Sequence, residues 1–114
     1  MFKKTQYFEA MSIQNNRQYN NERNLLKAGY SYNYIPTSVL LQIVKECVNA
    51  HNDEVKNGNK LKFTFIGSLD KEHAQFSLTG HRNDIDKFIT DLCTTDDVLN
   101  HWTVSKISKY SLVH

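Results

Sequence analysis

The chain has 114 residues, 39% hydrophobic and 23% charged, which are the values of one globular domain with a single core. Fourteen basic and 12 acidic residues leave a net charge of +2, which excludes a strong whole-protein field for attracting nucleic acid or an anionic membrane but leaves room for a local basic face. No apolar run is long enough for a transmembrane helix, and MFKKTQYFEA lacks the apolar region of a secretory signal. We therefore expect a cytoplasmic protein, in whichever cell hosts it.

A first strand is expected over residues 2–13, FKKTQYFEAMSI, where apolar side chains recur with imperfect alternation. Residues 14–35 follow as a polar insert rich in asparagine. Its first part is compatible with a loop or with a short helix that ends at Gly29, because glycine accepts the left-handed conformation there. We expect one α+β domain over residues 1–114, with the insert placed after its first strand.

The clearest helix is predicted over residues 36–57, PTSVLLQIVKECVNAHNDEVKN. Pro36 suits a first helical turn, and Gly58 ends the pattern. Apolar side chains recur at three- and four-residue spacing, which indicates one stripe that faces the core. The stripe consists of Val39, Leu40, Ile43, Val44, Cys47 and Val48.

Two alternating segments, KLKFTFI at 60–66 and HAQFSLT at 73–79, predict an antiparallel hairpin with a turn over residues 67–72. A glycine then separates the hairpin from HRNDIDKFITDLC, whose apolar spacing predicts an amphipathic helix with capping and acidic residues near its start. The end of the chain, HWTVSKISKYSLVH, is rich in β-branched and aromatic residues and predicts a last strand.

This element order resembles the split βαβ arrangement of ferredoxin-like folds, and FSLTGHRNDIDKFITDL is similar to the strand-glycine-helix corner of that fold. The predicted fold is therefore ferredoxin-like (βαββαβ): an antiparallel sheet with two helices. The expected core comprises Phe8, Val39, Leu40, Ile43, Val44, Cys47, Leu61, Phe63, Phe65, Phe76, Leu78, Ile85, Phe88, Ile89, Leu92 and Trp102. Such a fold carries no function by itself.

The insert ends in three tyrosines, Tyr30, Tyr32 and Tyr34, at alternate positions, with Tyr19 nearby. In an extended segment the three rings would face one way. The rings could pack on the domain's own core, bind a partner protein or stack on bases. A further alternative is that the segment is an edge strand that pairs with a second copy of the chain in a homodimer. The residues alone leave these alternatives open.

Lysines form a second candidate binding surface, a basic edge that would also include Lys3, Lys4 and Lys71. The lysines of this edge predicted to bind are Lys60, Lys62, Lys106 and Lys109. Lysine and stacked rings suit single-stranded nucleic acid, whereas the alternative is that these lysines are simply solvated on edge strands. Recognition of RNA on the open sheet face is not expected, because the outward side chains of 73–79 are His73, Gln75 and Ser77.

Catalytic and metal-binding patterns are absent from the sequence. Its five histidines and two cysteines form no HxH, HExxH or CxxC pair, and we expect Cys47 and Cys93 to be buried free thiols. There is no phosphate-cradling glycine loop and no GxSxG elbow, and Asp84, Asp86 and Asp91 fit the solvated face of a helix. We therefore expect no enzyme, no metal and no cofactor.

The sequence favours a small non-catalytic interaction protein. Abundant asparagine and lysine point to an AT-rich genome such as that of a phage or mobile element. The expected function is inhibition or regulation of a host or defence protein, bound through the aromatic patch with lysines at its rim. The alternative is an accessory protein that binds single-stranded nucleic acid through the tyrosines and the lysine edge.

Overall fold

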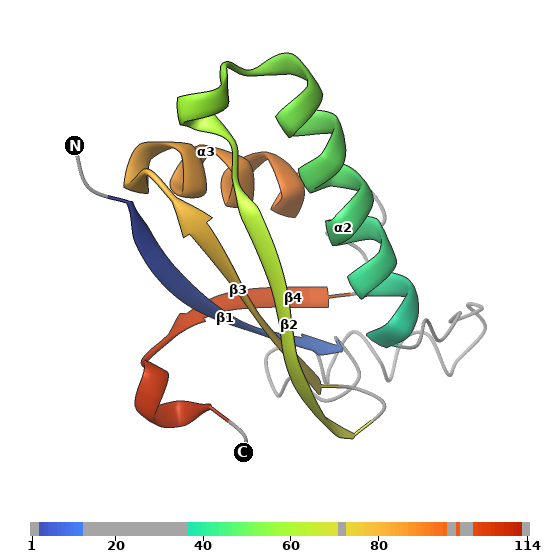
Figure 1. Cartoon of the computed structure of the whole chain (residues 1–114). Coiled ribbons are helices and arrows are strands. Elements are labelled where there is room, and N and C mark those ends of the chain that lie inside the picture. The colour runs from blue at the N-terminus through green and yellow to red at the C-terminus, as the bar shows by residue number, and fades with distance from the viewer. Residues whose placement is uncertain (1–2, 13–36, 71–72, 96–97, 99–101, 113–114) are drawn as a thin grey trace.

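The computed structural model describes residues 3–12, 37–70, 73–95, 98 and 102–112 of the chain (Figure 1). The insert, with its possible short helix and its tyrosines, lies outside these residues. The described elements are β1 (Lys4–Ser12), α2 (Thr37–Glu54), η3 (Asn57–Asn59), β2 (Lys62–Asp70), β3 (His73–Gly80), α3 (Arg82–Cys93), β4 (Trp102–Ile107) and η4 (Lys109–Ser111).

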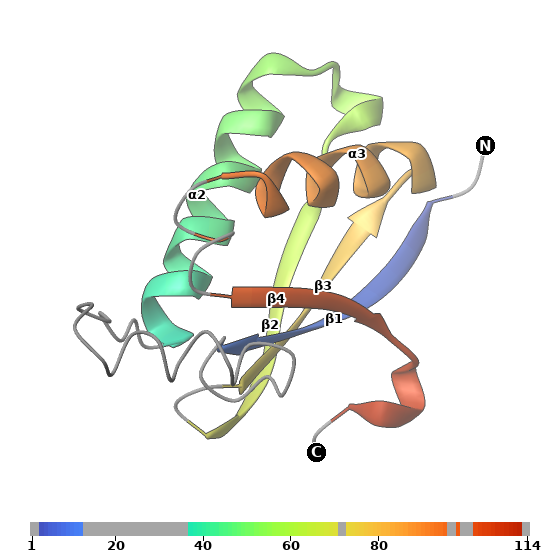
Figure 2. The same cartoon turned by 180° about the vertical axis from the view of Figure 1, so that it is seen from behind.

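The strands form one antiparallel sheet in the order β2-β3-β1-β4. Its register places Phe8 opposite Phe76, and Phe76 opposite Phe65. Both helices cover one face of the sheet, and η4 lies on the other side (Figures 1 and 2). The structure therefore confirms an α+β fold with a four-stranded antiparallel sheet and two helices, in which β1 and β3 are the central strands, as predicted.

Two predicted element boundaries are wrong. β2 continues to Asp70, through residues expected to form a turn, and its pairing with β3 shifts register between Phe65 and Gly67 and again before Asp70. These irregularities let the strand continue past a glycine that otherwise favours a turn. The last strand ends at Ile107, because the Ser108 hydroxyl accepts a hydrogen bond from the Tyr110 amide and starts the short helix η4.

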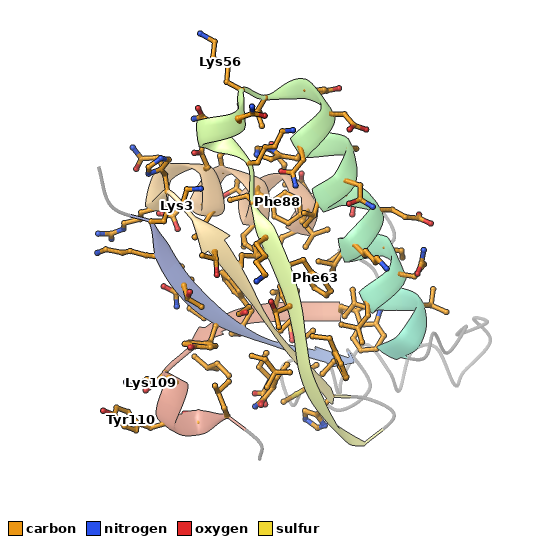
Figure 3. The ribbon with its side chains drawn as sticks, viewed as in Figure 1. Lys3, Lys56, Phe63, Phe88, Lys109 and Tyr110 are labelled. Atoms are coloured by element: carbon orange, nitrogen blue, oxygen red, sulfur yellow. The ribbon has the colours of Figure 1, made fainter. Side chains whose placement is uncertain are left out.

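The core lies between the sheet and the two helices, and Figure 3 shows Phe63 and Phe88 pointing into this layer. Most predicted core residues are buried or pack against the buried cluster. Buried apolar residues that the predicted core did not include are Ala10, Val48, Ala74 and Val98, although Val48 was assigned to the core-facing helix stripe.

Two predicted core residues are exposed. Phe65 is 50% exposed, because β2 is an edge strand and its regular pairing with β3 is interrupted directly after this residue. Val39 is 42% exposed, because the buried centre of the α2 stripe runs through Leu40, Val44 and Val48, and Val39 begins its flank.

The sheet face away from the helices is covered at the middle of β3. Gln75 and Ser77 point to this side, yet they are only 1% and 5% exposed. The Gln75 Nε2 atom donates to Glu9 Oε1 at 3.3 Å and to the Ser111 carbonyl oxygen at 3.2 Å, which ties the segment after β4 to the sheet. The outward direction of Gln75 and Ser77 was predicted correctly, but these residues do not form an open platform.

In the part of the chain that the structure describes, neither helix combines the length and the apolarity that crossing a membrane requires.

Candidate anion-binding site

The four lysines of the basic edge that were predicted to bind do not share an edge. Lys62 begins β2, at one edge of the sheet, whereas Lys106 lies on β4, at the other edge. Lys62 also points to the face away from the helices, while Lys106 lies opposite the buried Phe8 and points to the helix side. Both lysines, however, lie level with the first half of β1 in the paired strands. They are therefore toward the same end of the sheet.

A pocket of about 260 Å³ opens at this end, between the beginning of β1, the beginning of α3 and the end of β4. The lining residues are Lys4, Gln6, Arg82, Ile85, Asp86 and Lys106. Alternation along β1 places the two residues of that strand on the same side as Phe8. The three residues from α3 share one helix face, because they follow the spacing i, i+3 and i+4.

Asp86 organises the cations of this pocket. Its Oδ1 atom is 2.9 Å from Lys106 Nζ, and its Oδ2 atom is 3.8 Å from Arg82 Nε. The three side chains are 42%, 50% and 73% exposed, respectively, so each pair stabilises the fold by only about 0–1 kcal/mol. The carboxylate therefore positions two cations without holding them tightly.

The pocket is positively charged. Lys4, Arg82 and Lys106 stand against one carboxylate, which leaves two positive charges in excess. Within the described residues, Lys4 forms no ion pair. α3 begins at Arg82, so the positive end of its macrodipole adds to the field of these cations. Ammonium and guanidinium groups in this arrangement can donate charge-assisted hydrogen bonds to carboxylate or phosphate oxygens.

The remaining predicted site residues lie elsewhere. Lys60 follows η3, and Lys109 lies in η4, with its Nζ atom 5.4 Å from the ring centroid of Tyr110. Tyr110 is 88% exposed. Figure 3 shows Lys3 at the start of β1, and Lys109 and Tyr110 in the segment that follows β4. Tyr19, Tyr30, Tyr32 and Tyr34 lie outside the described residues, as does Lys71 of the basic edge.

Sequence reasoning did not assign Arg82, Gln6 or Asp86 to a site. It included Lys4 in the basic edge but not among the four lysines predicted to bind. The signals that could have found them are present. Helical spacing groups Arg82 with Ile85 and Asp86, and strand alternation groups Lys4 with Gln6. The sequence does not show that β1 and β4 are neighbours in the sheet. That pairing is what brings Lys106 close to the other two cations.

Both cysteines are free thiols, and they are half-buried rather than fully buried. Burial raises the pKa of the Cys93 thiol above its ordinary value. Burial also raises the pKa of Cys47, and the neighbouring Glu46 carboxylate raises it further. Both thiols therefore stay protonated at neutral pH, which is typical of packing cysteines rather than nucleophiles.

A second pocket, of about 240 Å³, lies between α2 and α3. Phe88 and Leu92 contribute to its lining, together with Cys47, His51 and Asp91. The His51 ring meets the Phe88 ring edge to face, with centroids 5.9 Å apart. Among the described residues, no three histidine, cysteine or acidic side chains are arranged to hold a metal ion.

No protein-family model matches the chain, and comparisons with curated proteins and with solved structures find no match either.

Proposed function

We propose that this chain is a small non-catalytic interaction protein that binds single-stranded nucleic acid. The observation that carries the proposal is the pocket in which Lys4, Arg82 and Lys106, from three different elements, leave two positive charges in excess. Phosphate contacts of this kind supply most of the affinity of sequence-independent nucleic-acid binding.

A single strand fits this surface better than a duplex. A duplex is read by a helix or ribbon that enters a groove, and α3 carries Asp84, Asp86 and Asp91 along its length. A flexible strand, in contrast, can place one phosphate in the pocket and another near Lys3. The exposed ring of Tyr110, with Lys109 beside it, offers a base-stacking surface of the type that single-strand binders use.

A variant series tests the proposal. The affinity of a labelled oligothymidine is measured by fluorescence anisotropy for the unchanged protein and for a Lys4→Gln/Arg82→Gln variant. Lys45→Gln/Lys56→Gln is the matched control, since both of its lysines are exposed and lie outside the pocket. We expect the pocket variant to lose at least tenfold in affinity and the control to lose much less. Equal losses would contradict the role of the pocket.

A protein partner is the second candidate, in the form of a host or defence protein that the chain inhibits or regulates. The observation that favours it is the exposure of two large apolar side chains on the helix side of the molecule, Phe65 at 50% and Val39 at 42%. A contact of this kind depends weakly on salt, whereas phosphate contacts weaken steeply as salt rises. Nuclease-resistant capture of one stoichiometric protein would favour this candidate.

We also propose that the topology is ferredoxin-like. The antiparallel pairs place β1 parallel to β2 with β3 between them, and β3 parallel to β4 with β1 between them. The split βαβ arrangement consists of two βαβ units, and one strand of each unit lies between the two strands of the other. The observed pairing has this pattern. An experimental structure that preserves this strand order, with right-handed crossovers, is the result expected.

A further inference from the structure

The size, charge and internal ion pairs of the pocket point to one kind of phosphate. We propose that it binds a phosphate monoester, and that under the proposed function, on which this inference rests, the monoester is the phosphorylated end of the strand. The pocket would then recognise a strand terminus rather than the phosphodiesters along the strand.

The charge of the pocket matches a monoester. A phosphodiester carries one negative charge, whereas a phosphate monoester carries about 1.5 to 2 at neutral pH and has three strong acceptor oxygens. Lys4, Arg82 and Lys106 exceed Asp86 by two positive charges, so a dianion neutralises the pocket and a monoanion leaves it charged.

Asp86 sets how much positive charge the pocket presents. Its carboxylate lies 2.9 Å from Lys106 and 3.8 Å from Arg82 and offsets one of the three cations. The two positive charges that remain in excess attract a dianion about twice as strongly as a monoanion, and the dianion can be shared with Lys4. Asp86 itself is a positioning residue that orients Lys106 and Arg82.

The shape of the pocket also favours a terminus. Residues from β1, α3 and β4 line an open pocket of about 260 Å³, which is just below the range of small-ligand sites. A terminal phosphate enters such a pocket with a single connection to the rest of the ligand. An internal phosphodiester has to bring the strand in and out of the same opening.

The test compares oligonucleotides of one sequence, labelled at the 3′ end, that carry a 5′-hydroxyl, a 5′-phosphate or a 5′-phosphate methyl ester. The methyl ester retains the phosphorus but carries the single charge of a diester. We expect the 5′-phosphate strand to bind at least fivefold tighter than the other two. A parallel set labelled at the 5′ end tests a 3′-phosphate in the same way.

Variants locate the effect. Arg82→Gln and Lys106→Gln should remove the preference for the phosphorylated strand, whereas Lys45→Gln should keep it. Asp86→Asn should widen the preference, because removing the carboxylate relieves a repulsion that a dianion experiences about twice as strongly as a monoanion. Amide NMR shifts on adding the phosphate strand should concentrate at residues 4–6, 82–86 and 106. Shifts confined to other parts of the chain would overturn the assignment.

The outcomes separate the two proposals. Equal, salt-sensitive binding of all three strands would overturn the monoester inference and leave single-strand binding in place. Binding of a free mononucleotide or inorganic phosphate without binding of any strand would support monoester chemistry and overturn the proposed function. If neither the strands nor the small phosphates bind, both proposals are wrong.

Discussion

Phe65 and Phe88 differ in what they contribute to stability, although the sequence assigns both to the core. Strand alternation assigns Phe65, and helical spacing assigns Phe88. Phe88 is 5% exposed and packs in the main cluster, whereas Phe65 is 50% exposed. We expect Phe88→Ala to lower the free energy of unfolding by about 3–5 kcal/mol, because it removes a buried ring and leaves a cavity. Phe65→Ala should cost about 1 kcal/mol or less. Urea denaturation checks both values, and similar losses for the two variants would contradict this core.

Two glycines offer a matched pair of substitutions. A Cβ atom on Gly80 would lie 2.5 Å from Leu61 Cδ2 and 3.4 Å from the Lys60 carbonyl oxygen, whereas a Cβ on Gly58 meets nothing within 4 Å. Leu61 is only 4% exposed, so it has little room to move. Gly80→Ala should therefore cost about 1–3 kcal/mol, and Gly58→Ala should be neutral or stabilise by up to about 1 kcal/mol. Thermal denaturation of both variants tests this contrast, which equal melting temperatures would refute.

At the scale of elements, one side chain fastens α2 to the beginning of the hairpin. Asn52 Nδ2 donates to the Leu61 carbonyl oxygen, and the Leu61 amide donates to Asn52 Oδ1, both at 2.8 Å. Asn52→Ala leaves both backbone groups without these bonds and should cost about 1–3 kcal/mol. Asn49→Ala, at an exposed position of the same helix, is the control and should be neutral or slightly stabilising. Loss of stability in the control alone would contradict this role of Asn52.

Patterns in the sequence were sufficient for the elements themselves. The stripe on α2, the alternation before and after residues 67–72 and the apolar spacing on α3 each correspond to an observed element. What they could not predict depends on neighbouring strands. Phe65 alternates in the same way as Phe63, yet its exposure follows from the edge position of β2 and from the register shift after it. The burial of Gln75 likewise depends on a bond to Ser111, 36 residues away.

For the whole molecule, the arrangement of charge matters more than its total. A net charge of +2 gives no indication of a binding surface, but the fold gathers Lys4, Arg82 and Lys106 around one pocket. The sequence identified the correct residue type, and Lys106 and Lys4 themselves, but assumed a single lysine edge. Strand order divides that edge between β2 and β4, so this part of the candidate site could not be predicted before the topology was known.

The most direct test of the central claim is the salt dependence of single-strand binding, measured for the unchanged protein and for a Lys4→Gln/Arg82→Gln/Lys106→Gln variant. We predict that the logarithm of the binding constant falls linearly with the logarithm of salt concentration. The pocket holds one phosphate, and each neutralised phosphate contributes roughly 0.7 to the slope on single strands, so the slope of the variant should be shallower by about 0.7. A slope that is the same in both proteins, or close to zero in the unchanged protein, would contradict the claim that this pocket binds nucleic-acid phosphate.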